Sequence, residues 1–296
     1  MGTVIDQVEV AHPRLRGRHS ALHLAVAAAK DCLRQAQCEP HELDLVVNAG
    51  IYRDKNLGEP ALAALIQDDI GANPEDPHSD AHGTFSFDVA NGSCGVLTAL
   101  QIVDGFLRSR SVHRALVVTS DADPGHGMSE NFPFSAAGAA LLCGWTDEDY
   151  GLSRVSWANA GDASDDLETS AATVGFADGR NVLRFRQSVD ADDRFAAVAA
   201  EAARACLAEH NLPLTDVELM VAAPARPRYR EALSTLLGFP VEKLCVADDH
   251  RMHTAALAAA FGKQNASLRA GSQVLFVAAG AGVVAGAALY RQPPAH

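Results

Sequence analysis

The chain carries the same helix–turn–strand unit twice. The first copy covers residues 28–47 and the second residues 202–221, and Cys32 corresponds to Cys206 at the same offset. In each copy an apolar spacing typical of an amphipathic helix is followed by a short turn with a proline and then by a mostly apolar strand. A unit repeated once in this way predicts a fold made of two similar halves.

The segments that follow each copy continue as strands and helices in alternation. Candidate strands cover residues 84–90, 115–120, 136–144, 243–247, 274–279 and 283–290, and candidate helices cover 95–107 and 254–264. Continuous apolar runs are typical of strands that are covered on both faces, so we predict an α/β layered protein. We expect an N-terminal half at residues 1–158 that carries a nucleophile, a polar connection at 159–180 and a C-terminal half at 181–296.

The charge balance and the cysteines exclude several classes of protein. The chain has 24 Lys and Arg against 37 Asp and Glu, a net charge of −13 without a basic stripe, so nucleic acid is not an expected partner. Its six cysteines form no Cys-x-x-Cys pair, which indicates free thiols in a reducing compartment, and no metal site is expected. We find no export signal and no apolar stretch of membrane-spanning length, and therefore expect a cytoplasmic protein without membrane contact.

A nucleophile is indicated where the strand that ends near Ala90 turns into the helix that starts at Gly95. This turn contains Ser93 and Cys94. The start of a helix presents unpaired N–H groups and the positive end of the helix dipole, which stabilise a thiolate or an oxyanion. Both side chains also have a structural interpretation, Ser93 as a helix cap and Cys94 as a small packing residue.

The segment Phe87-Asp88-Val89-Ala90, followed by small residues and a glycine-containing helix start, resembles the active-site segment of ketoacyl synthase III enzymes in the thiolase superfamily. Residues 58–71, 115–121 and 278–283 resemble further segments of that family. The resemblance implies a thiolase-like five-layer α/β/α/β/α sandwich of two pseudo-symmetric half-domains. It also implies a homodimer formed through the region before Ser93.

The catalytic positions implied by this resemblance differ from those of the family. Ser93 falls at the family's acyl-accepting Cys, Ala223 at its His and His253 at its Asn. The resemblance therefore implies Ser93 as the nucleophile, His253 as its base, and the backbone N–H groups of Ser93 and Ala281 as the oxyanion hole. A local shift of one residue makes Cys94 the nucleophile instead, and His253 has an alternative role as a helix cap or a buried hydrogen-bonding residue.

The absence of the family's His, whose position is Ala223 here, affects which reaction we expect. The family's condensation holds an acyl group on a thiolate and uses His and Asn to stabilise the enolate of a malonyl thioester, whereas here only His253 could remain of that pair. Acyl transfer through an acyl-serine, from a CoA or acyl-carrier-protein thioester to an acceptor in lipid or secondary metabolism, is the function we expect. Two alternatives stay open: a non-catalytic ketosynthase-like subunit that forms a heterodimer with an active partner, and a Cys94-dependent condensing enzyme or thioester hydrolase. No permanently bound cofactor is expected.

Three arginines form a basic cluster on this acidic chain, at Arg226, Arg228 and Arg230. By the resemblance, Arg228 matches a position at the mouth of the pantetheine tunnel, so we expect the cluster to bind the substrate or its carrier. A solvated helix start is the structural alternative. The family's N-terminal Trp-Ile-x-x-Arg-Thr-Gly segment has no match between Val10 and Ser20, which favours a carrier-protein donor, or no donor at all, over CoA.

Overall fold

The duplicated sequence unit forms two sets of strands with the same order and the same directions. The computed structural model describes residues 2–13, 20–73, 83–160, 169–174, 181–280 and 282–294. The first set has the order β3-β2-β4-β6-β1 and the second the order β12-β11-β13-β14-β8. In each set the first three strands are parallel and the last two are antiparallel to their neighbours.

The strands of the large sheet have the following bounds. They are β1 (Gly2–Ala11), β2 (Leu45–Asn48), β3 (Phe85–Asp88), β4 (Ala115–Asp121), β6 (Ala137–Thr146), β7 (Gly151–Leu152), β8 (Ser156–Asn159), β11 (Leu219–Ala223), β12 (Leu244–Cys245), β13 (Gln273–Gly280) and β14 (Val284–Arg291). The short β7 pairs with both β1 and β14, and so joins the two sets into one sheet.

Helices occupy corresponding places in the two halves. They are α1 (Ala21–Gln35), α2 (Leu62–Ile70), α3 (Gly95–Arg108), α4 (Ala191–Glu209), α5 (Pro227–Leu237) and α6 (Ala256–Asn265). Short 3-10 turns cover Pro40–Glu42, Asp54–Asn56, Gly92–Cys94 (η3), Leu214–Asp216 and Val241–Lys243. The predicted helices at 95–107 and 254–264 correspond to α3 and α6, and the predicted strand at 243–247 is shorter, because only Leu244–Cys245 pairs with β11.

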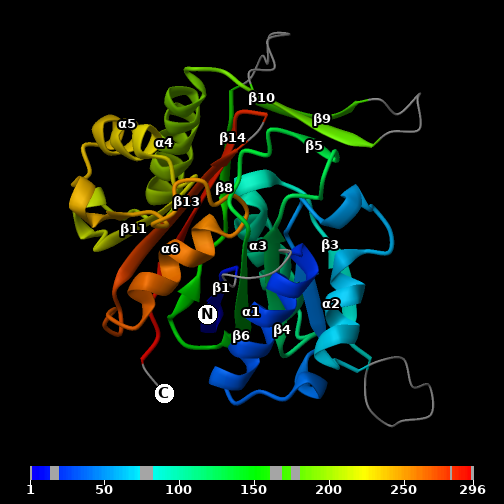
Figure 1. Ribbon diagram of the computed structural model, residues 1–296. Helices are drawn as coiled ribbons and strands as arrows, with labels where there is room; N and C mark the ends of the chain where they lie inside the picture. The colour runs from blue at the N-terminus through cyan, green and yellow to red at the C-terminus, as the bar shows by residue number, and fades with distance from the viewer. Residues whose placement is uncertain are drawn as a thin grey trace.

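Alternating side chains of the strands divide the core into layers. In β2, Leu45 and Val47 pack in the central cluster with residues of α3 and α6, whereas Val46 packs with α1 and α2 on the other face. In β11, Val221 lies in the central cluster, and its neighbours Met220 and Ala222 pack against α4 and α5. A strand turns successive side chains to opposite faces, so these runs need helices on both sides. Figure 1 shows α1 and α2 at one side and α4 and α5 at the other. The fold is the predicted five-layer α/β/α/β/α sandwich.

A small second sheet contributes part of the predicted connection between the halves. Strand β9 (Thr169–Val174) lies inside the interval 159–180 and pairs antiparallel with β10 (Val182–Gln187). Strand β10 also pairs in parallel with β5 (Ser129–Glu130). The residue limits of the two halves stay predictions.

Asp88, in the Phe87-Asp88-Val89-Ala90 segment, binds the start of α2. Its carboxylate accepts hydrogen bonds from the amides of Leu62 and Ala63 at the start of α2, at 2.9 and 2.8 Å, and from the Asn48 side chain at 3.1 Å. It also pairs with Arg53 at 3.2 Å. Because the first amides of a helix have no partner within the helix, Asp88 supplies one to α2.

Replacing this carboxylate is expected to destabilise the fold. Asp88→Ala leaves two helix amides and the partly buried Arg53 without their acceptor, which we expect to cost about 1–3 kcal/mol of unfolding free energy. Urea denaturation followed by circular dichroism measures the change. Asp31→Ala, which breaks an exposed pair with Arg34 on α1, serves as the control and should leave the midpoint nearly unchanged. Equal stability of the two variants would contradict this role of Asp88.

Candidate functional site

The predicted nucleophile lies in the turn η3, directly before α3. Gly92 has a φ of +50°, a left-handed conformation that glycine adopts without the strain a side chain would bring. Ser93 follows with a relative exposure of 6% and lines a cavity of about 510 Å³. The Ser93 hydroxyl makes no hydrogen bond within the described part of the chain. It is therefore free to meet a substrate in the cavity.

Aromatic and basic side chains form most of the wall of this cavity. The aromatic ones are Tyr52, Phe134, Phe185 and Phe195, and the basic ones are Arg186, Arg226, His250, Arg251 and His253. The wall contains residues from both halves of the chain, since Ser93 precedes α3 and His253 lies shortly before α6. The two corresponding strand-to-helix junctions thus meet in one cavity.

Cys94, the alternative nucleophile, lies outside the cavity lining. Its side chain is 1% exposed, belongs to the central apolar cluster, and has its Sγ 3.7 Å from the Val284 carbonyl oxygen. Burial raises the pKa of the Cys94 thiol to about 12. Since the thiolate is the reactive form of cysteine, this environment disfavours Cys94 as a nucleophile.

His253 is held with one ring nitrogen near the nucleophile turn and the other on a carboxylate. A Cβ placed on Gly92 would lie 3.7 Å from His253 Nε2. On the opposite side of the ring, Nδ1 lies 3.1 Å from Asp121 Oδ2. The ring of Phe134 stacks on the imidazole, with centroids 4.1 Å apart and planes inclined by 19°. No direct hydrogen bond joins His253 to Ser93 within the described residues, and catalytic bonds of this kind often tighten only when substrate binds.

Asp121 was not among the residues singled out from the sequence. It is the last residue of β4, its side chain is buried, and Oδ2 also accepts from the Thr254 amide at 2.9 Å and the Thr254 hydroxyl at 2.6 Å. The other oxygen accepts from the amides of Tyr52, at 2.8 Å, and Ile51, at 3.2 Å. The carboxylate therefore ties β4 of one half to the segment before α6 of the other.

The charge of Asp121 determines which ring nitrogen of neutral His253 carries the proton. Burial by itself would raise the pKa of Asp121, but the facing His253 and the hydrogen bonds from Thr254 and Tyr52 outweigh burial and hold that pKa below its usual value. Asp121 is therefore ionised at neutral pH and can only accept hydrogen bonds. In neutral His253 the ring proton then sits on Nδ1, which leaves Nε2 as an acceptor on the side of the nucleophile turn.

The three clustered arginines have different environments. Arg226 lines the cavity and pairs with Asp192, whose Oδ1 lies 2.6 Å from Arg226 Nε. Arg228 pairs with Asp193 at the surface, where its side chain is 53% exposed. Arg230 donates to the carbonyl oxygens of Leu244 and Val241 and so holds the start of β12. Of the three, the cavity includes Arg226 only.

The second predicted oxyanion donor, Ala281, lies outside the described residues. Its neighbour Gly280 ends β13 close to the nucleophile turn, because a Cβ added there would lie 3.5 Å from the Ser93 amide nitrogen. Both Ser93 and Gly280 line the cavity. The oxyanion hole at Ser93 and Ala281 stays a prediction.

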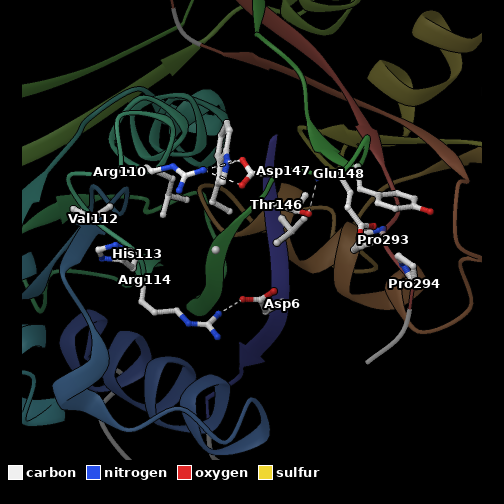
Figure 2. A pocket seen from close by; sticks show the side chains of 15 residues that line it. Asp6, Arg110, Val112, His113, Arg114, Thr146, Asp147, Glu148, Pro293 and Pro294 are labelled. Carbon is white, nitrogen blue, oxygen red and sulfur yellow. Dashed lines mark hydrogen bonds and ion pairs between the residues drawn. The ribbon is translucent and has the colours of Figure 1, made fainter. Parts of the chain in front are cut away.

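A second cavity, of about 700 Å³, lies at the other end of the first set of strands, where β4 begins and β6 ends. Figure 2 shows that its arginines face acidic partners: Arg110 makes two hydrogen bonds to Asp147, and Arg114 pairs with Asp6. None of the residues predicted to act in catalysis lines it. This cavity is larger, but we assign the chemistry to the cavity that holds Ser93 and His253, because both predicted catalytic side chains line that one.

No protein-family model matches the chain. Over an alignment 304 positions long, the chain is 25% identical to the β-ketoacyl-[acyl-carrier-protein] synthase III of Aquifex aeolicus, with 97% of this chain and 89% of that protein covered. Over an alignment 312 positions long, it is 29% identical to the enzyme of the same name from Paramagnetospirillum magneticum, with coverages of 97% and 90%. The chain is similar to ketoacyl synthase III. The resemblance noted in the active-site segment thus extends over nearly the whole chain.

Solved structures show that this ketoacyl synthase III-like chain has the thiolase fold. The 3-oxoacyl-[acyl-carrier-protein] synthase III of Aquifex aeolicus superposes with a TM-score of 0.79 at 21% identity, covering 98% of this chain and 100% of that one. The priming β-ketosynthase of the R1128 polyketide pathway gives 0.82 at 19% identity, with coverages of 99% and 97%. Together, the relatives and the fold support an acyl-transferring or condensing enzyme.

The described residues contain neither a metal-binding cluster nor a helix able to cross a membrane. No group of three or more His, Cys, Asp or Glu side chains there is placed to hold a metal ion. In the same residues, no helix is long and apolar enough to cross a membrane.

Proposed function

We propose that the protein is an acyltransferase that carries the acyl group on Ser93. The observation that supports this most is the shared cavity: Ser93 lines it, His253 lines it, and Asp121 holds His253 with Nε2 on the side of the nucleophile turn. Serine needs a base to become a nucleophile, and an imidazole oriented by a carboxylate is such a base. Cys94 has neither access to the cavity nor a depressed pKa.

The reaction runs in two half-reactions. Ser93 Oγ attacks the thioester carbonyl carbon while His253 Nε2 takes the hydroxyl proton, and the Ser93 amide supports the negative oxygen. The tetrahedral intermediate expels the thiolate, which receives the proton from the imidazolium, and an acyl-serine ester remains. An acceptor hydroxyl or amine then attacks this ester with His253 again as base, and Ser93 recovers its proton.

Condensation is less compatible with the cavity than acyl transfer. Forming a carbon–carbon bond from a malonyl thioester needs donors that stabilise an enolate, and the resemblance places Ala223 at one of those two positions. Ala223 is a fully buried methyl side chain at the end of β11 and offers no donor. The acyl group on Ser93 is therefore passed to a heteroatom acceptor.

The donor in this proposal is a thioester of an acyl carrier protein or of CoA. The curated relatives are named for an acyl carrier protein, which supports such a donor here. The exposed Arg228 is our candidate for contact with the carrier. No permanently bound cofactor takes part in either half-reaction.

Intact-protein mass spectrometry tests the proposal. We expect the protein, incubated with a panel of acyl-carrier and acyl-CoA thioesters, to gain the mass of one acyl group and to lose it again when an acceptor amine or alcohol is added. A protein that stays unmodified with every thioester would contradict the proposal and favour a non-catalytic subunit that supports an active partner.

We also propose a homodimer formed through β3. This strand is at the edge of the large sheet, and within the described chain it pairs with β2 alone. Phe85 on β3 is 57% exposed. An unpaired strand edge with an exposed aromatic side chain is suited to pairing with a second copy.

Light scattering after size exclusion tests the dimer. Phe85→Lys places a charge on the edge strand, and we expect it to shift the protein from dimer to monomer. Val189→Lys, at an apolar side chain that is 87% exposed before α4, should leave the dimer intact. A native monomer, or a dimer that persists in Phe85→Lys, would rule out this interface.

A further inference from the structure

The cavity is lined by basic side chains on an acidic protein. Three arginines and two histidines line it, whereas its described lining includes no Asp or Glu, although the chain has a net charge of −13. Arg186 and Arg251 are exposed, and Arg226 is less so, with 22% of its side chain accessible. An anionic group that enters this cavity meets basic side chains, although one of them, Arg226, already faces Asp192, which is not among the described lining residues.

Within the described residues, Arg226 has N–H groups that make no hydrogen bond. Its Nε lies 2.6 Å from Asp192 Oδ1, yet these two buried atoms do not align as a hydrogen bond, and its guanidinium carbon lies 5.4 Å from the centre of the Phe195 ring. Within the described residues its two terminal nitrogens make no hydrogen bond. Burial lowers the pKa of Arg226 and raises that of Asp192, so each charge is poorly solvated where it stands. The guanidinium can gain from a further acceptor.

These contacts distinguish between classes of acyl group. A plain alkyl chain against Arg226 would remove water from the guanidinium and return no hydrogen bond, which costs free energy. A carboxylate at the same place can accept two parallel N–H bonds from the planar guanidinium, the strong pairing that arginine is shaped to make. The aromatic walls from Tyr52, Phe134 and Phe185 exclude water and strengthen this pairing.

We propose, building on the acyl-serine function, that the transferred acyl group ends in a carboxylate and that Arg226 binds this carboxylate. The substrate class is the half-thioester of a dicarboxylic acid, such as a succinyl or malonyl thioester. The Ser93 Oγ–carbonyl bond forms and the carbon–sulfur bond breaks, while the distal carboxylate is unchanged on Arg226. Arg226 is thus a specificity-determining residue.

Binding to Ser93→Ala, which cannot form the ester, tests the inference apart from catalysis. Calorimetry compares N-acetylcysteamine thioesters, which lack the phosphates of CoA and of the carrier. Succinyl is paired with 4-methylpentanoyl and malonyl with 3-methylbutanoyl, so that an isopropyl group replaces the carboxylate at nearly equal size. Arg226→Gln is then added to Ser93→Ala. Arg184→Gln is the control, because Arg184 lies on β10 but pairs with Glu130 away from the cavity lining.

We expect at least one carboxylate thioester to bind tenfold or more tightly than its branched partner, a preference lost with Arg226→Gln and kept with Arg184→Gln. Equal binding of the partners, or a preference that survives Arg226→Gln, overturns the inference. Mass spectrometry of the unmutated protein with the same thioesters reports separately on the acyl-serine. An adduct without carboxylate preference retains the proposed function alone, and a carboxylate preference without any adduct retains the Arg226 site alone.

Discussion

Ser93→Ala is expected to abolish acyl transfer. The variant keeps the cavity and the His253–Asp121 pair but has no hydroxyl to form the ester, so the rate of acyl transfer should fall by roughly a thousandfold or more. Loss of one buried oxygen atom should change the unfolding midpoint little. The measurement is the initial rate of acyl release from the thioester, followed through the free thiol.

Cys94→Ala is the matched control on the neighbouring residue. The Cys94 side chain packs in the central cluster outside the cavity lining, so its loss leaves a small cavity and costs about 1 kcal/mol of stability, with the transfer rate within a few-fold of the native protein. The opposite pattern, with activity kept in Ser93→Ala and lost in Cys94→Ala, would move the nucleophile by one residue and restore the condensing or hydrolytic alternative.

Asp121→Asn is expected to reduce kcat by roughly 10²–10⁴-fold, with KM little changed. An amide that directs its NH₂ group at His253 Nδ1 turns that nitrogen into an acceptor and moves the ring proton to Nε2. The imidazole then faces the nucleophile with a donor and cannot take the Ser93 proton. Nitrogen-15 NMR of His253 reads the tautomer directly, and we expect the proton on Nδ1 in the native protein and on Nε2 in the variant.

Asp104→Asn controls for the loss of a buried carboxylate. Asp104 on α3 accepts from the Thr3 hydroxyl at 2.9 Å and pairs with Arg108, outside the cavity lining. This variant should lose stability but keep kcat and the His253 tautomer. If Asp121→Asn altered kcat without changing the tautomer, or if Asp104→Asn had the same effect on kcat, Asp121 would not orient the imidazole.

The repeated unit made the fold predictable. The helix and strand of each copy lie in corresponding places, α1 and β2 in the first half and α4 and β11 in the second, because the same apolar spacing must be buried in both. Strand β1 was not predicted. Its ten residues alternate only in part between buried and half-exposed, and its position depends on pairing with β6, far along the chain.

The site was predicted in part. The turn before the helix at Gly95 indicated Ser93, the family resemblance singled out Ser93 and His253, and the structure brings both to one cavity. Asp121 could not be singled out, since Asp88 ends β3 in the same way as Asp121 ends β4. Asp88 turns to the start of α2, whereas Asp121 meets His253 from the other half, and only the packing of the halves distinguishes them. In the same way, only the folded structure distinguishes Arg226, which lines the cavity, from Arg228 and Arg230, which do not.

The location and chemistry of the acyl group test the central claim most directly. The native protein is acylated with a thioester, digested, and the modified peptide sequenced by tandem mass spectrometry before and after treatment with neutral hydroxylamine, which cleaves thioesters far faster than oxygen esters. We predict an acyl group on Ser93 that survives the treatment. An acyl group on Cys94 that the treatment removes would contradict the account.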